Sequence, residues 1–184
     1  MGGGRARSTR ERIYRVLGEA PERGASLVEF ALVLPILMML LFGIVTGGLA
    51  LNSKNSLNNA AREGARYGAT LPVDPTMNAF LADVADVAIR SATSELDNGI
   101  PGRTVCVAYV HPAGSLATDQ TAALRIDAGG VSAFSPNPCF ADGRPNDERR
   151  VQVRVTRDVD FFALVISRTL TLDEQSVSRY ERLQ

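Results

Sequence analysis

Few residues in this chain have side chains suited to acid–base, nucleophilic or metal chemistry. Among its 184 residues there is one histidine, His111, which stands before Pro112 and has no Ser-His or Cys-His pairing. The opening Gly2–Gly4 run lacks the preceding strand that a phosphate-binding loop requires. Asp158 and Asp160 form an Asp-x-Asp pair, which is more often solvated surface than a carboxylate site. The sequence therefore predicts that the protein is not an enzyme and holds no metal or cofactor.

The two cysteines, Cys106 and Cys139, are the remaining reactive side chains. Outside the cytoplasm two cysteines usually pair. A bond between them would close a loop and raise the stability of the fold by roughly 3–4 kcal/mol in the chain-entropy model. The alternative is a metal pair, but two cysteines and the distant His111 cannot complete a four-ligand zinc site without carboxylates. We predict a disulfide between them.

Charge is distributed unevenly along a chain whose formal net charge is zero. Residues 1–24 contain six arginines and three glutamates, residues 30–51 contain no charge, and residues 52–184 carry 14 basic and 16 acidic side chains. This near-neutral C-terminal region excludes a nucleic-acid binder that depends on bulk positive charge. The long uncharged run excludes a simple globular protein of the cytosol.

The uncharged run predicts a transmembrane helix. Its 22 residues span roughly 33 Å as a helix, enough for a bilayer core of about 30 Å. A cleaved secretory signal is the alternative, but its apolar region is shorter, roughly 7–15 residues. The arginines precede the run and only Lys54 follows it closely. The positive-inside rule therefore predicts a single-pass membrane protein with a cytoplasmic N-terminus and residues 52–184 outside.

The residues at the start of the run form a recognisable pattern. Gly24 ends the basic segment, Glu29 lies four residues after Ala25, and Phe30 begins the apolar run, in the sequence RGASLVEFALVLP. This pattern resembles a type IV prepilin processing site, and Glu followed by an aromatic residue resembles tight-adherence (Flp) pilins. With the later AAREGARYGA segment, residues 23–69 are similar to TadE-like minor pseudopilins. One departure from the pilin pattern is the small Ala25, where a large hydrophobic residue is usual.

The resemblance implies a role for each matched residue. A prepilin peptidase would cleave between Gly24 and Ala25, where the absence of a glycine side chain lets the chain enter a protease cleft in extended form. Glu29 would pair with the new amine of a neighbouring subunit, offsetting the cost of both charges in an apolar environment. Other pilins or pseudopilins and pilus platform proteins would be the partners. The alternative is a plain signal anchor that carries Gly and Glu at this spacing by coincidence.

Small residues dominate the segment that follows the membrane span. Ala60, Gly64 and Gly68 recur every fourth residue beside a second row of alanines, so another helix can approach closely. One interpretation is packing between subunits, which leucine substitutions in this row would disturb. The other is packing against the protein's own sheet. A continuous helix from Ala25 to Ala69 would be roughly 68 Å long and would act as a stalk.

The remaining residues predict an α+β fold with an antiparallel sheet. Thr76 caps a second helix that Asn98–Gly102 ends. Strands are expected at residues 104–110, 123–128, 151–156 and 170–180, with 161–166 a buried segment of uncertain type and 129–148 an exposed loop. The expected organisation is a basic leader at 1–24, a transmembrane helix at 25–51, a helical stalk at 52–71 and an extracytoplasmic domain at 72–184.

The sequence thus predicts a minor pseudopilin of a tight-adherence pilus, acting in pilus assembly, adhesion or secretion and located in the inner membrane or within a surface pilus. A pseudopilin of a type II-like secretion system is the alternative within the same class. A signal-anchored extracytoplasmic binding domain is the alternative from a different class. Leader cleavage and association with pilus proteins would separate these hypotheses.

Overall fold

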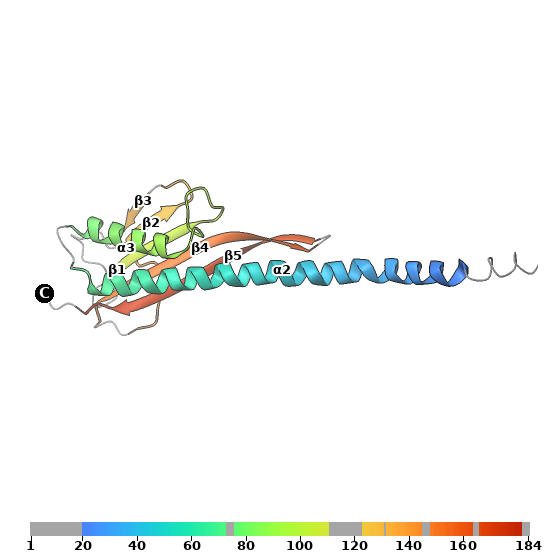
Figure 1. The fold of residues 1–184 in the computed structure, drawn as a ribbon. Helices are drawn as coiled ribbons and strands as arrows, with labels where there is room; N and C mark the ends of the chain where they lie inside the picture. The colour runs from blue at the N-terminus through green and yellow to red at the C-terminus, as the bar shows by residue number, and fades with distance from the viewer. Residues whose placement is uncertain are drawn as a thin grey trace, which may run out of the picture.

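The computed structural model describes residues 20–72, 76–110, 123–130, 132–144, 148–163 and 166–181. A long helix, α2 (Ala20–Thr70), is followed by a second helix, α3 (Met77–Ser91). Five strands come next: β1 (Thr104–Val110), β2 (Ala123–Asp127), β3 (Ser132–Ser135), β4 (Arg150–Ala163) and β5 (Ile166–Arg179). Figure 1 shows one end of α2 packed into a small domain while the other end projects from it. The predicted α+β fold is confirmed.

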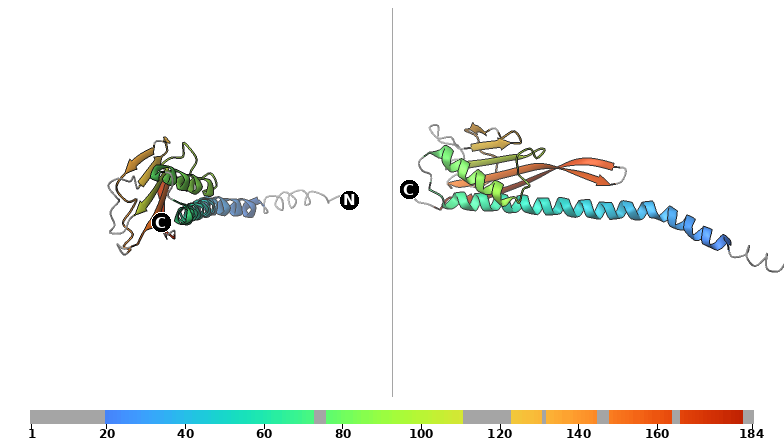
Figure 2. Two further views of the ribbon diagram at one scale, coloured as in Figure 1. Left: turned by 90° about the vertical axis from the view of Figure 1, so that its left-hand side faces the viewer. Right: turned by 45° about the horizontal axis from the view of Figure 1, so that its top comes forward.

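Helix α2 is continuous over 51 residues, about 76 Å at the usual rise, so the predicted membrane and stalk segments form one rod. Pro35 lies inside it, and the right-hand view in Figure 2 shows the rod changing direction in its blue N-terminal part. The helix ends at Thr70 because Pro72 cannot continue it.

The sheet is antiparallel throughout, in the order β3-β2-β1-β4-β5. Strand β1 lies in the centre and is buried along almost its whole length. One face of the sheet packs against α2 and α3, and valines alternate along β4 so that Val151, Val153 and Val155 enter this core. The ring of Phe80 in α3 packs edge-on against the rings of Tyr109 and Tyr180, with centroids 5.9 and 6.5 Å away.

Helix α3 begins as predicted, with the Thr76 hydroxyl accepting a hydrogen bond from the amide of Ala79. The predicted end of the helix near Asn98 was wrong, because α3 ends at Ser91. Thr93 and Ser94 adopt φ values of 49° and 69°, a left-handed conformation that terminates the helix.

Two expectations for the C-terminal half were also wrong. The expected loop at 129–148 contains strand β3, whose Ser132–Ser135 pairs with β2. The expected buried segment at 161–166 was wrong in its described part: residues 161–163 pair with 166–168 at the end of the β4-β5 hairpin, where the Phe162 side chain is 53% exposed. Composition suggested burial because apolar residues are usually buried, but this hairpin extends beyond the body of the sheet.

Candidate membrane and assembly interface

The N-terminal half of α2 exposes an apolar surface. Fourteen described residues between 30 and 51 carry large hydrophobic side chains that are at least 38% exposed: Phe30, Leu32, Val33, Ile36, Leu37, Met38, Met39, Leu40, Leu41, Phe42, Ile44, Val45, Leu49 and Leu51. The hydroxyl of Thr46 donates to the carbonyl of Phe42 at 2.7 Å, so its polar atom is satisfied within the helix. Among the described residues, α2 is the helix long and apolar enough to span a membrane. A soluble fold would bury such a surface, whereas a lipid bilayer accommodates it.

The predicted processing residues lie on this exposed part of α2. Gly24, Ala25, Glu29 and Phe30 are all solvent-accessible, and a Cβ added at Gly24 would meet no atom within 4 Å. The Gly24–Ala25 peptide bond lies inside the helix. A protease that binds extended chain would therefore have to unwind the first turns of α2. That unwinding is local, because this stretch does not pack on the domain.

The small-residue row of α2 packs within the chain itself. Ala60 is fully buried, and Gly64 and Gly68 are buried as well. A Cβ on Gly64 would lie 2.9 Å from the Ala88 Cβ of α3. A Cβ on Gly68 would lie 2.9 Å from a methyl group of Val151 and 2.9 Å from one of Val84. Of the two interpretations that the sequence left open, the structure favours packing against the protein's own sheet and helix.

Replacing Gly68 with leucine is expected to lower the free energy of unfolding by about 1–3 kcal/mol, since the new side chain overlaps Val84 and Val151. Thermal unfolding in detergent, followed by circular dichroism, measures the change. The control is Gly47→Leu on the same helix, where an added Cβ meets nothing within 4 Å. Equal stability of the two variants would mean that the row is not held against α3 and β4.

The predicted disulfide is present. The Cys106 and Cys139 sulfurs are 2.04 Å apart, and both residues are buried. The bond joins central strand β1 to the segment after β3 on the sheet face opposite α2, where Ala108, Val110 and Ala123 complete a second small apolar cluster. It therefore fixes residues 136–144 over a sheet face that neither α2 nor α3 covers.

A buried ionic network stabilises the same segment. Arg150 donates to both carboxylate oxygens of Asp142, at 2.6 and 2.9 Å, and Gln152 donates to Asp142 at 2.8 Å. Both charged side chains are 5% exposed. Burial alone would raise the pKa of Asp142, but the hydrogen bonds from Gln152 and Arg150 outweigh it and lower the pKa. The period-2 pattern of β4 places Arg150 and Gln152 on one face but does not show that a loop covers that face.

The C-terminal residues bind the end of α2. The Tyr180 hydroxyl donates to the carbonyl of Leu71 at 3.0 Å, and the amide of Glu181 donates to the carbonyl of Ala69 at 3.1 Å. These bonds satisfy carbonyls in the last turn of α2 and beyond it, where a helix lacks partners of its own. Residues 180 and 181 therefore close the domain around the stalk.

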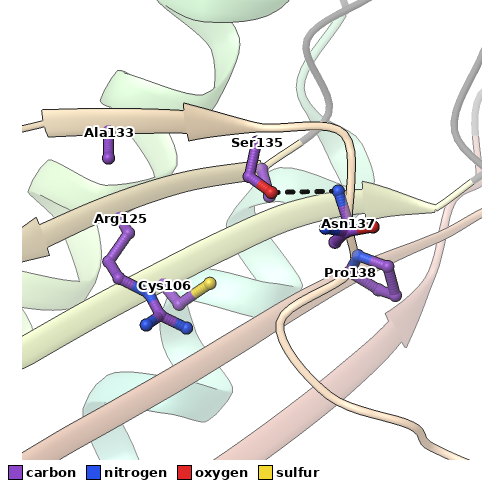
Figure 3. Close-up of a pocket in the computed structure, with 7 residues that line it drawn as sticks. Cys106, Arg125, Ala133, Ser135, Asn137 and Pro138 are labelled. Carbon is purple, nitrogen blue, oxygen red and sulfur yellow. Dashed lines mark hydrogen bonds between the residues drawn. The ribbon is translucent and has the colours of Figure 1, made fainter. Parts of the chain in front are cut away.

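A cavity of about 320 Å³ lies beside the disulfide. Figure 3 shows its lining, in which the amide of Asn137 donates to the Ser135 hydroxyl. The described lining contains one charged side chain, Arg125, and no carboxylate or histidine to act with it. Nor do the described residues contain a cluster of three histidine, cysteine or acidic side chains that could hold a metal ion. His111 lies outside the described residues.

The comparisons with known proteins identify the segment that carries the predicted motif. A family model described as TadE-like protein matches residues 24–66, from the proposed cleavage glycine through the stalk. No curated protein and no solved structure matches the chain. The TadE-like pilus family is structural rather than catalytic. Residues 24–66, less than half of the chain, are thus similar to TadE-like proteins, a similarity that supports a component associated with a tight-adherence pilus.

Proposed function

We propose that the protein is a minor pseudopilin, anchored in the inner membrane by residues 25–51 of α2 and released into pilus assembly by a prepilin peptidase. The observation that supports this most strongly is the exposed apolar rod that begins with Gly24, Glu29 and Phe30 and continues without a break into the domain core. In this arrangement the membrane segment can pass from lipid into a helical fibre core while the folded domain stays outside.

Cleavage between Gly24 and Ala25 is the first test. The N-terminal sequence and intact mass of the protein are measured in native membranes with and without the peptidase. We expect a start at Ala25 that depends on the peptidase. A start within residues 1–2 in both cases would instead indicate the alternative, a signal-anchored binding domain.

Glu29→Gln is expected to impair pilus assembly while leaving membrane insertion unchanged. Glu29 is exposed on α2, so its carboxylate is available to the new amine at Ala25 of a neighbouring subunit. The measurement is pilus yield in a strain carrying the variant, with alkaline extraction of membranes as the insertion assay. Glu63→Gln is the matched control, because Glu63 is also exposed on α2 but lies in the stalk. Normal piliation by Glu29→Gln would exclude this pairing.

A further inference from the structure

The hairpin of β4 and β5 extends beyond the rest of the sheet. Strand β1 pairs with β4 only as far as Thr156, whereas β5 pairs with β4 out to Ala163. Residues 157–163 and 166–172 therefore form a two-stranded ribbon, which we call the hairpin arm. Figure 1 and the right-hand view of Figure 2 both show this arm running beside α2 toward its N-terminal end.

The arm reaches the level of the apolar run of α2. Glu174, just beyond the arm on β5, accepts a hydrogen bond from Asn58 at 2.8 Å and lies 3.7 Å from the Lys54 ammonium. Ile166 is eight residues further along the strand, about 26 Å at the usual rise. Leu51, the last residue of the uncharged run, is only about 5 Å along the helix from Lys54. The end of the arm thus extends past Leu51.

On β4, the side chains of the arm change from polar to apolar toward its end. Asp158 and Asp160 accept hydrogen bonds from Thr171 and Thr169, at 2.6 and 2.8 Å, which satisfies their carboxylates on the shaft. The next residues are Phe161 and Phe162, and residues 161–166 contain no charge. Phe162 is 53% exposed and Leu170 46% exposed.

The exposed apolar groups occupy both faces of the ribbon. Leu170 pairs with Val159, so its side chain shares a face with Phe161, whereas Phe162 points to the opposite face. An arm that docked on a protein would be apolar on the docking face alone. Apolar groups on both faces fit an end that is immersed in lipid. Arg168 lies directly opposite Phe161 on the same face, and its long side chain can carry the guanidinium away from the apolar end.

We propose that the end of the hairpin arm, at Phe161, Phe162 and Leu170, inserts into the bilayer leaflet nearest the domain. This inference rests on the proposed membrane anchoring of α2, because the arm is then brought to the lipid surface by the helix itself. The arm is a second membrane contact, beside the helix, and holds the domain at a fixed orientation to the bilayer.

Tryptophan fluorescence tests this directly, because the chain contains no tryptophan. Phe162→Trp is introduced into the full chain, which is reconstituted in vesicles of phosphatidylethanolamine and phosphatidylglycerol with or without bromine on the acyl chains. Phe134→Trp is the matched control, since Phe134 is 48% exposed but lies on β3. Phe42→Trp, on the apolar run of α2, reports on anchoring.

We expect bromine to quench most of the fluorescence of Phe162→Trp and Phe42→Trp and none of that of Phe134→Trp. Quenching of Phe42→Trp without quenching of Phe162→Trp would overturn the arm proposal and leave anchoring intact. A blue-shifted but unquenched Phe162→Trp would place the arm against protein, which also overturns it. An unquenched Phe42→Trp would overturn both the arm proposal and the membrane anchoring on which it rests.

Discussion

Replacing Cys106 with serine is expected to lower the free energy of unfolding by roughly 3–4 kcal/mol. The disulfide with Cys139 spans a sequence separation of 33 residues and is the covalent tie between β1 and the segment that covers the outer sheet face. Without it, the unfolded chain regains the freedom of that loop. Denaturant unfolding in detergent micelles measures the loss.

Cys139→Ser provides the matched variant. Because the loss comes from the bond rather than from either side chain, the two single variants and the double variant should have the same stability. Wild-type protein in a strong reductant should approach the same value, and Phe140, packed on the second cluster, should become accessible to protease. Unequal losses for the two serine variants would show that packing of one thiol, and not the bond, dominates.

Asp142→Ala is expected to cost about 3 kcal/mol, the lower end of the range for removing one partner of a buried ion pair. The substitution leaves the Arg150 guanidinium, which is 5% exposed, without its carboxylate and also removes an acceptor from Gln152. Asp173→Ala is the control, because its pair with Arg154 is 35% exposed on both sides and should cost less than about 1 kcal/mol. Equal losses of stability in Asp142→Ala and Asp173→Ala would contradict the view that burial makes the Asp142 pair the more important one.

The Asp142 carboxyl group should also make the stability of the fold depend on pH in the acid range. Since the folded-state pKa of Asp142 lies below its ordinary value, the carboxylate stabilises the fold at and above that ordinary value. This contribution disappears as the pH falls through the lowered pKa, because the proton then binds in the folded state too. Stability should therefore decrease more steeply in acid for the wild type than for Asp142→Asn. Parallel curves would exclude the ionic network as the cause.

Much of the architecture could be predicted from the sequence because its signals are strong and local. The apolar run, the alternating valines of β4 and the Thr76 cap each specify an element without reference to the rest of the chain. The cysteine pairing followed from the small number of alternatives. None of these predictions required knowledge of the tertiary contacts between elements.

The sequence could not predict which element packs against each surface, because composition describes the surface itself and not the element that contacts it. Gly64 and Gly68 signal a close approach but are equally compatible with α3 or with another subunit. The apolar residues at 161–166 suggested a buried segment, yet Phe162 is exposed at the end of a hairpin. Arg150 lay among charges of both signs, so its buried pair with Asp142 required the loop to be in place.

Helix α2 also fixes the angle between its exposed N-terminal part and the folded domain. Since the helix runs unbroken from Gly24 into the core at Leu57, each residue between the apolar run and the core contributes about 100° of rotation and 1.5 Å of height. Inserting a single residue at Asn52–Asn55 would turn the domain by more than a quarter revolution relative to Glu29. The length of this short connector therefore fixes the side of the helix from which the domain projects, and in the proposed fibre it would decide which way the domain faces.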